Sequence, residues 1–144
     1  AHDLPHRFEH CLEVQLPFLQ RVLTDFSVVP VVVGETPAEE VAAIIQRVWG
    51  AAGTLLIVSS DLSHYHGYEV ARQRDRQTAD AILGLEPRLT GEDACGCYAV
   101  NGLLLFAREH GKRAELLCLK NSGDTAGDKS RVVGYGAFAF FDAT

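Results

Sequence analysis

The spacing of hydrophobic residues changes between helical and strand-like periods along the first half of the chain. Leucines recur every three to four positions over 8–23, which predicts a helix that Pro17 kinks. The short β-branched run 27–33 and the continuous apolar run 54–59 both predict buried strands. A helix is expected between them at 37–49, because a Thr-Pro pair opens that segment and a glycine closes it.

The second half of the chain continues the same alternation. Amphipathic spacing predicts helices over 68–83 and 95–110, and two further strands are expected at 115–119 and 133–141. Helices that alternate with strands are typical of an α/β fold. We therefore expect a mixed, largely parallel sheet flanked by helices, and no linker divides residues 1–144 into smaller domains.

Composition and charge narrow the class of protein. The chain has 144 residues, 47% of them hydrophobic, and a formal charge of −6 without a cluster of basic residues, which argues against nucleic-acid binding. No apolar run approaches the roughly 20 residues that a membrane span needs. The four cysteines are not spaced like a disulfide framework, so we expect a protein of the reducing cytoplasm. The absence of any methionine suggests a trimmed chain that lacks its natural beginning.

The densest group of reactive side chains directly follows the strand expected at 54–59. Residues 59–64 read Ser-Ser-Asp-Leu-Ser-His and include Asp61 and His64. Sites in α/β proteins collect beyond the carboxyl ends of strands, which favours a functional loop. A loop that only caps the next helix is an equally good interpretation.

Two other positions carry candidate chemistry. His10 lies three residues before Glu13, so the two can share a helical face and approach one metal ion. Cys95 lies where a helix is expected to begin, and the amides of a helix N-terminus favour the thiolate that binds metals or attacks electrophiles. The plainer alternatives are a solvated helix face for His10 and a small packed side chain for Cys95.

Several blocks of the sequence occur in the order and spacing of one known family. They are EHCLEVQLPF at 9–18, VPVVVG at 29–34, SSDLSHY at 59–65, CG at 95–96, NSGD at 121–124 and VGYGA at 133–137. In these blocks the chain resembles the Memo family, which is called AmmeMemoRadiSam system protein B in bacteria. The resemblance extends over nearly the whole chain and identifies residues 1–144 as the C-terminal part of a single Memo-like domain.

The resemblance carries expectations about fold and site. Memo proteins are similar in fold to class III extradiol dioxygenases, which use non-haem Fe(II), but they have two histidines and a cysteine where those enzymes have His, His and Glu. The second family histidine corresponds to His10 and the cysteine to Cys95, while Asp61 and His64 match residues of the same pocket. The first family histidine belongs to a V-P-H-A-G block that this chain does not contain. The resemblance therefore implies a fold truncated at the N-terminus, with no metal held by this chain alone.

Three functions remain open at this point. The first is a metal-dependent redox protein that uses iron or copper, with zinc as a competitor, in which Asp61 orients His64 as a general acid or base. The second is a non-enzymatic module whose cleft binds a peptide, a small molecule or partner proteins; the family name implies radical-SAM and AMMECR-type proteins as partners. The third is a hydrolase-like or thiol-redox protein in which His64 activates Cys95 as the nucleophile.

The sequence also makes a geometric prediction. His10, Asp61, His64 and Cys95 should converge on one cleft, although up to 85 positions separate them, because all four match the pocket of one family. A structure with His10 and Cys95 on opposite faces of the sheet would contradict this assignment.

Overall fold

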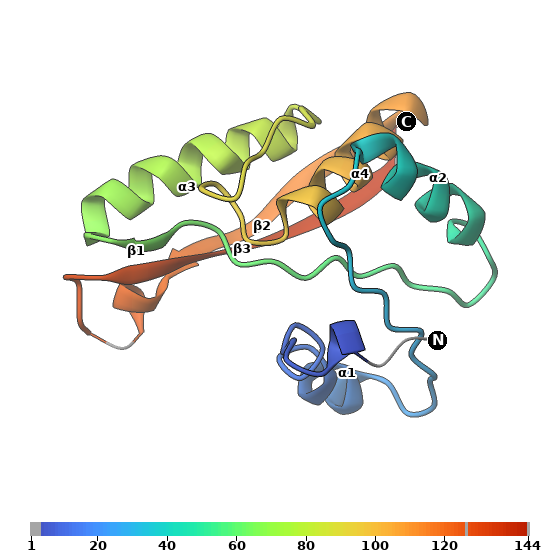
Figure 1. Cartoon of the computed structure of the whole chain (residues 1–144), viewed down its shortest axis with the longest axis horizontal. Coiled ribbons are helices and arrows are strands. Elements are labelled where there is room, and N and C mark those ends of the chain that lie inside the picture. Colours follow the sequence, from blue (N-terminus) through green and yellow to red (C-terminus); the bar gives the residue numbers. More distant parts are fainter. Residues whose placement is uncertain (1–3, 126, 144) are drawn as a thin grey trace.

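A computed structural model describes residues 4–125 and 127–143 of the chain. The longer helices lie on one side of a narrow sheet, and the N-terminal segment lies on the other side (Figure 1). In chain order the elements are η1 (Leu4–His6), α1 (Leu16–Val22), α2 (Ala38–Val48), β1 (His64–His66), α3 (Tyr68–Leu83), α4 (Cys97–Glu109), β2 (Lys112–Asn121), η2 (Ser122–Asp124) and β3 (Val132–Asp142).

The sheet has the strand order β1-β3-β2, and both of its strand pairs are antiparallel. The long β2–β3 pair runs from Lys112 opposite Asp142 to Asn121 opposite Gly134, with one irregularity between Leu116 and Cys118. Only the loop 122–131 joins these two strands, and a short connection between neighbouring strands produces antiparallel pairing.

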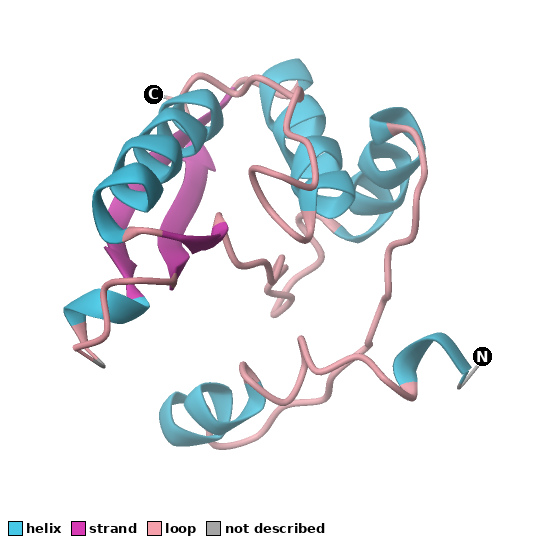
Figure 2. Ribbon diagram, turned by 60° about the vertical axis from the view of Figure 1, so that its left-hand side comes forward, coloured by secondary structure: helices cyan, strands magenta, loops and turns pink. Residues whose placement is uncertain are grey.

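The expectation of a largely parallel sheet is wrong for the described part of the chain. The runs 27–33 and 54–59, which were expected to be buried strands, are extended but pair with no strand among residues 4–125 and 127–143. Both follow loop paths between the helices and the N-terminal segment (Figure 2). Apolar, β-branched composition favours an extended backbone, but a strand also needs a neighbouring backbone to pair with. The broader expectation of a mixed α/β fold is confirmed.

The helices agree better with the hydrophobic periodicity. α2, α3 and α4 confirm the helices expected at 37–49, 68–83 and 95–110, with bounds that agree to within two residues. Within the described ranges, no helix combines the length and apolar character that crossing a bilayer requires.

α1 is shorter than the helix expected over 8–23. Pro17 lies in the first turn of α1, where its missing N–H would have no helical partner anyway, so it begins the helix instead of kinking it.

Two hydrophobic clusters hold α4 in place. The first packs α2 against α4 through the buried residues Val41, Ala42, Ile45, Leu103, Leu105 and Phe106. The second packs the end of α3 and the following loop against the other side of α4 through Ala81, Ile82, Leu89, Ala94, Cys97 and Leu104. Phe140 of β3 contacts both clusters. The start of α4 is therefore anchored in the core through Ala94 and Cys97.

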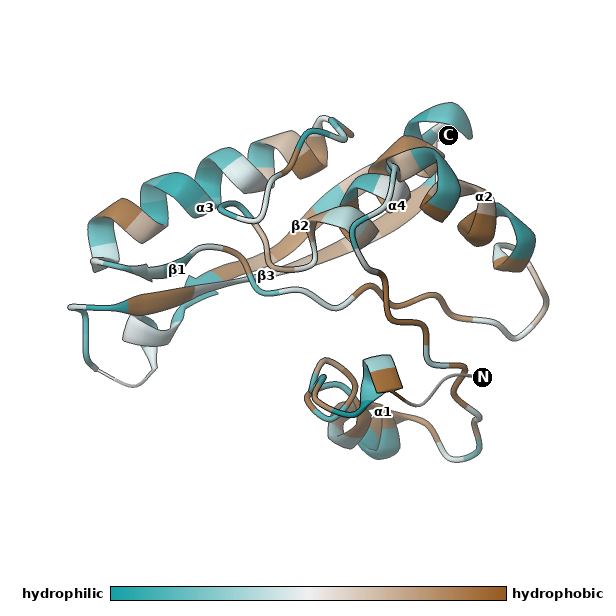
Figure 3. Ribbon diagram, viewed as in Figure 1, coloured by the Kyte–Doolittle hydropathy of each residue, from teal (hydrophilic) through white to brown (hydrophobic). Residues whose placement is uncertain are grey.

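The N-terminal segment is packed much more loosely. α1 has no buried residue, and Phe18 is 73% exposed. The apolar character of this segment and of the extended run after it is visible in Figure 3, and Val29 is 86% exposed. A side-chain hydrogen bond joins the segment to the rest of the fold: the Gln15 amide Nε2 donates to Ser59 Oγ at 3.0 Å.

Close packing of α2 on α4 predicts the effect of a small substitution. A Cβ added at Gly102 would lie 2.3 Å from Val41 Cβ, so Gly102→Ala should lower the free energy of unfolding by about 1–3 kcal/mol. Urea denaturation measures this change. Gly91→Ala is the matched control, because its new Cβ would meet nothing within 4 Å.

Adding Val41→Ala to Gly102→Ala should recover part of the loss, since the smaller side chain leaves room for the new methyl group. Equal stability of Gly102→Ala and Gly91→Ala would show that the two helices are not in close contact.

Candidate functional site

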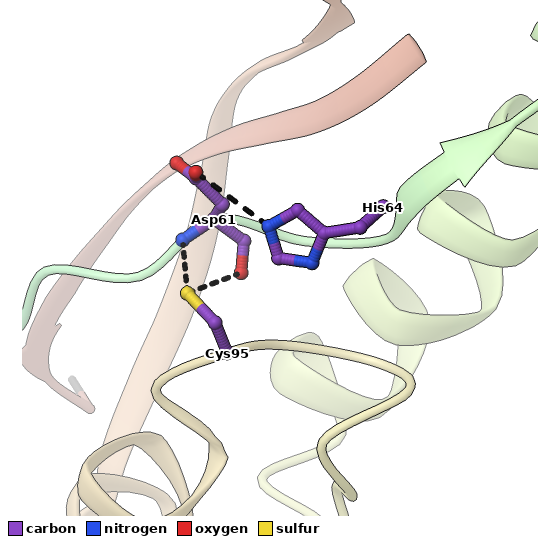
Figure 4. A group of neighbouring side chains, drawn as sticks. All are labelled: Asp61, His64 and Cys95. Atoms are coloured by element: carbon purple, nitrogen blue, oxygen red, sulfur yellow. Dashed lines mark hydrogen bonds and ion pairs between the residues drawn. The ribbon is translucent and has the colours of Figure 1, made fainter. Parts of the chain in front are cut away.

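Three side chains from two separate segments form the candidate site. Asp61 and His64 lie on the segment that leads into β1, and Cys95 lies two residues before α4 begins. One ligand atom from each residue can be chosen so that all three lie within 4.8 Å of one another. Figure 4 shows the sulfur of Cys95 next to the backbone of Asp61 and the imidazole of His64 facing its carboxylate.

The backbone at Asp61 holds the sulfur of Cys95. The Asp61 N–H donates to Cys95 Sγ at 3.2 Å, and the Asp61 carbonyl oxygen lies 3.9 Å from the same sulfur (Figure 4). Ser60 links the two segments, because its Oγ accepts the Gly96 N–H at 2.9 Å and donates to the Asp61 carbonyl oxygen at 2.7 Å. The position of the thiol is therefore set by backbone groups and one hydroxyl.

This contact depends on the glycine that follows the cysteine. A Cβ at Gly96 would lie 2.9 Å from Ser60 Cβ and 3.0 Å from the Ser59 carbonyl oxygen, closer than side chains ordinarily approach. Only a residue without a side chain allows the turn before α4 to approach the loop so closely.

The two cysteines of the CGC sequence have different surroundings. Cys95 is exposed, whereas Cys97 is 3% exposed and packs in the second cluster of α4. Burial raises the pKa of the Cys97 thiol, which keeps it protonated and unreactive. The thiol available for chemistry is thus that of Cys95.

His64 and Asp61 form a loose, partly solvated pair. The His64 Nε2 lies 3.7 Å from Asp61 Oδ2, too far for a strong hydrogen bond but close enough for an ion pair when the imidazole is protonated. The next residue, Tyr65, has φ of 61°, a left-handed conformation that non-glycine residues rarely adopt. Strained backbone of this kind often accompanies functional positions.

His10 does not belong to the group of atoms formed by Asp61, His64 and Cys95. Its side chain is 82% exposed, and its Nδ1 lies 3.9 Å from Glu9 Oε1. The structure thus brings together three of the four residues expected to converge. The role of His10 as a metal ligand stays a prediction.

Asp75 is a polar residue near the site that the sequence did not reveal. Its neighbours Arg72, Arg74 and Arg76 are typical of a solvated helix face, yet Asp75 is 2% exposed. Its Oδ1 accepts the N–H of Ser63, in the middle of the loop that carries Asp61 and His64, at 3.0 Å. No pattern in the sequence marks this aspartate as buried.

A groove of about 500 Å³ lies between α3 and the end of β2, away from the three clustered side chains. Asp124 lines this groove, and its Oδ1 accepts a hydrogen bond from the Tyr68 hydroxyl at 2.5 Å. This hydrogen bond is the main reason that the pKa of Tyr68 is raised and the pKa of Asp124 is lowered; the Asn121 N–H also lowers the pKa of Asp124. The NSGD block thus forms a one-turn helix with a capping box between Asn121 and Asp124.

Comparison with known proteins places the chain in a family. The family model described as "Memo-like protein" matches residues 1–139. The chain belongs to the Memo family.

Archaeal relatives agree with this membership. The chain is 39% identical to a MEMO1 family protein of Methanosarcina mazei, over 95% of this chain and 57% of the relative. It is 37% identical to one of Archaeoglobus fulgidus, over 96% of this chain and 57% of the relative. The chain thus spans about half the length of these Memo relatives.

The hydrogen bond between Tyr68 and Asp124 predicts a pH effect in this Memo protein. Tyr68→Phe removes the donor, so the pKa of Asp124 should rise toward its ordinary value. A carboxyl whose pKa is lowered by folding stabilises the fold above its unfolded pKa, and this contribution disappears as pH falls through the folded pKa. The stability difference between wild type and Tyr68→Phe should therefore be present at neutral pH and shrink in acid.

Carbon-detected NMR titration of the aspartate carboxyls measures this shift. Asp128 is an internal control, because its lowered pKa comes from hydrogen bonds with Ser130 and should not change. An unchanged pKa of Asp124 in Tyr68→Phe would contradict the assigned cause.

Proposed function

We propose that this protein contributes Cys95 and histidine ligands to a site for a divalent transition metal, iron or copper, that serves a redox reaction. The observation that carries the proposal is the approach of one sulfur, one imidazole nitrogen and one carboxylate oxygen to within 4.8 Å. Mixed donor sets of this kind suit transition metals and are unsuited to calcium or magnesium, which prefer oxygen ligands.

The spacing of the three donors fits a metal ion. Ligand atoms at the usual bond lengths of about 2.0–2.3 Å lie roughly 3–4 Å from one another around the ion. The 3.7 Å between His64 Nε2 and Asp61 Oδ2 is already in this range. The remaining pairs lie within 4.8 Å, and none of the three side chains is buried, so small side-chain rotations would bring these pairs into the same range.

The geometry supports one ligand set, and the family resemblance supports another. In the first, Cys95, His64 and Asp61 all bind the metal, as their proximity suggests. In the second, the metal binds Cys95, His10 and the histidine of the family's V-P-H-A-G block. His64 is then free to hold or move a proton at Nδ1, while Asp61 orients its ring through Nε2.

The bound metal would supply electron transfer and a coordination position for a small substrate. The chain's own residues would hold the ion, orient the imidazole and admit the substrate from the exposed side of the site. Possible partners in the complete protein, including radical-SAM and AMMECR-type proteins, are part of the same proposal.

Cobalt(II) titration of the purified, chelator-treated full-length protein, with the V-P-H-A-G segment present, tests this proposal, because cobalt–thiolate bonds absorb in the near ultraviolet. The wild type should show this absorption and Cys95→Ala should lose it. Cys118→Ala is the matched control, since Cys118 is also exposed and free but lies on β2 outside the cluster. Cobalt binding by Cys95→Ala with unchanged absorption would refute the site.

The histidine variants distinguish the two ligand sets. A directly bound His64 predicts that His64→Ala weakens cobalt binding about 10–100-fold or more. His66→Ala is its control, because His66 lies two residues further along the same strand but outside the cluster. Weaker cobalt binding by His10→Ala, together with unchanged binding by His64→Ala, supports the second ligand set.

A thiol enzyme is the second candidate, and the exposure of Cys95 beside His64 favours it. In this case the sulfur attacks an electrophile while the imidazole takes up the thiol proton. Iodoacetamide should then alkylate metal-free Cys95 faster than Cys118, and His64→Ala should remove the difference. Equal rates at the two cysteines in the wild type would exclude this candidate.

A further inference from the structure

Asp75 is a buried acid on α3 that also lines the groove between this helix and the end of β2. It lies in the middle of α3 and is 2% exposed. A carboxyl group taken out of water costs free energy unless polar partners replace its hydration. The groups that contact the Asp75 carboxyl therefore indicate the role of this side chain.

The first partner is the backbone of the loop that carries the candidate site. The N–H of Ser63 donates to Asp75 Oδ1 at 3.0 Å, and Ser63 is itself 1% exposed. Two more hydrogen bonds hold the same stretch to β3: the Leu62 N–H donates to the Gly134 carbonyl oxygen at 2.9 Å, and the Gly134 N–H donates to the Ser63 carbonyl oxygen at 2.8 Å.

The second neighbour of the Asp75 carboxyl group is Gly134 of β3, a residue without a side chain. A Cβ at Gly134 would lie 2.2 Å from Asp75 Oδ2, so the carboxyl group occupies the space that a side chain would need. Asp75 and Gly134 are therefore matched: the missing side chain on the strand lets the acid of α3 reach across to Ser63.

These contacts act on the two residues between the candidate ligands. Leu62 and Ser63 are both buried; Asp61 directly precedes this pair and His64 directly follows it. Fixing the pair 62–63 sets the directions in which Asp61 and His64 leave the backbone. In this arrangement His64 Nε2 lies 3.7 Å from Asp61 Oδ2.

We propose that Asp75 is a positioning residue for the Asp61–His64–Cys95 site, acting through the Ser63 amide without touching the ligand. This inference rests on the proposed metal function and adds to it a residue that supports the ligands from behind. Residues that orient metal ligands commonly change metal affinity about 10–100-fold when they are removed.

The test compares Asp75→Ala with Asp75→Asn in the purified protein, using cobalt(II) as the probe. Asp75→Ala removes the acceptor for Ser63 and should weaken cobalt binding about 10–100-fold. Asp75→Asn keeps an oxygen that can accept the same N–H, so its affinity should stay within about threefold of wild type. Thr78→Ala is the control, since Thr78 is buried one turn further along α3 and donates to the Arg74 carbonyl oxygen.

Amide hydrogen exchange at Ser63 gives a second readout that needs no metal. Protection of this amide should be lost in Asp75→Ala and kept in Asp75→Asn and Thr78→Ala. If the alanine variant does not fold, Gly134→Ala replaces it, because its new Cβ displaces the carboxyl group from Ser63 and should cause the same losses.

The results separate the two proposals. If wild type binds no cobalt, the metal function fails, while exchange at Ser63 still decides whether Asp75 holds the loop. Full cobalt affinity in folded Asp75→Ala would overturn the positioning role. An equally large loss of cobalt affinity in Asp75→Asn and Asp75→Ala would also overturn it, because the hydrogen bond from the Ser63 N–H would then not be the cause of the weaker binding.

Discussion

The candidate site depends on the close approach of Gly96 to Ser60. Cys95 lies on the turn before α4 and Asp61 lies on the loop before β1, and these segments are 34 residues apart in sequence. Their backbones come near enough for the Ser60 hydroxyl to accept the Gly96 N–H, and for Asp61 to donate its N–H to the sulfur. Any side chain at position 96 would separate them.

Each side of this contact is supported by a different part of the fold. The turn before α4 is held by the apolar clusters that pack α4 between α2 and the end of α3. The loop before β1 is held by polar contacts instead, from the Gly134 backbone and the buried carboxyl group of Asp75. Exposed reactive groups on well-supported loops are typical of sites that must admit a ligand and still keep their geometry.

The extended segments before α2 and before the candidate site are supported by few hydrogen bonds. The extended run 27–33 and residues 55–60 make no backbone–backbone hydrogen bond within the described ranges, although their composition is that of buried strands. Val29, Val31 and Leu55 remain largely exposed, whereas Val33, Leu56 and Val58 pack against the first hydrophobic cluster. The chain spans about half the length of its Memo relatives, and His10 lies in this loosely packed part.

Hydrophobic periodicity and family resemblance predicted a large part of the fold and of the candidate site. Periodicity was enough to predict α2, α3 and α4, since the buried face of a helix repeats in its own sequence. The family blocks singled out Asp61, His64 and Cys95, which the fold brings together. Tertiary structure alone decided the antiparallel sheet and the burial of Asp75. Strand pairing and the burial of a polar side chain depend on which distant backbone lies opposite, and no residue's immediate neighbours encode that partner.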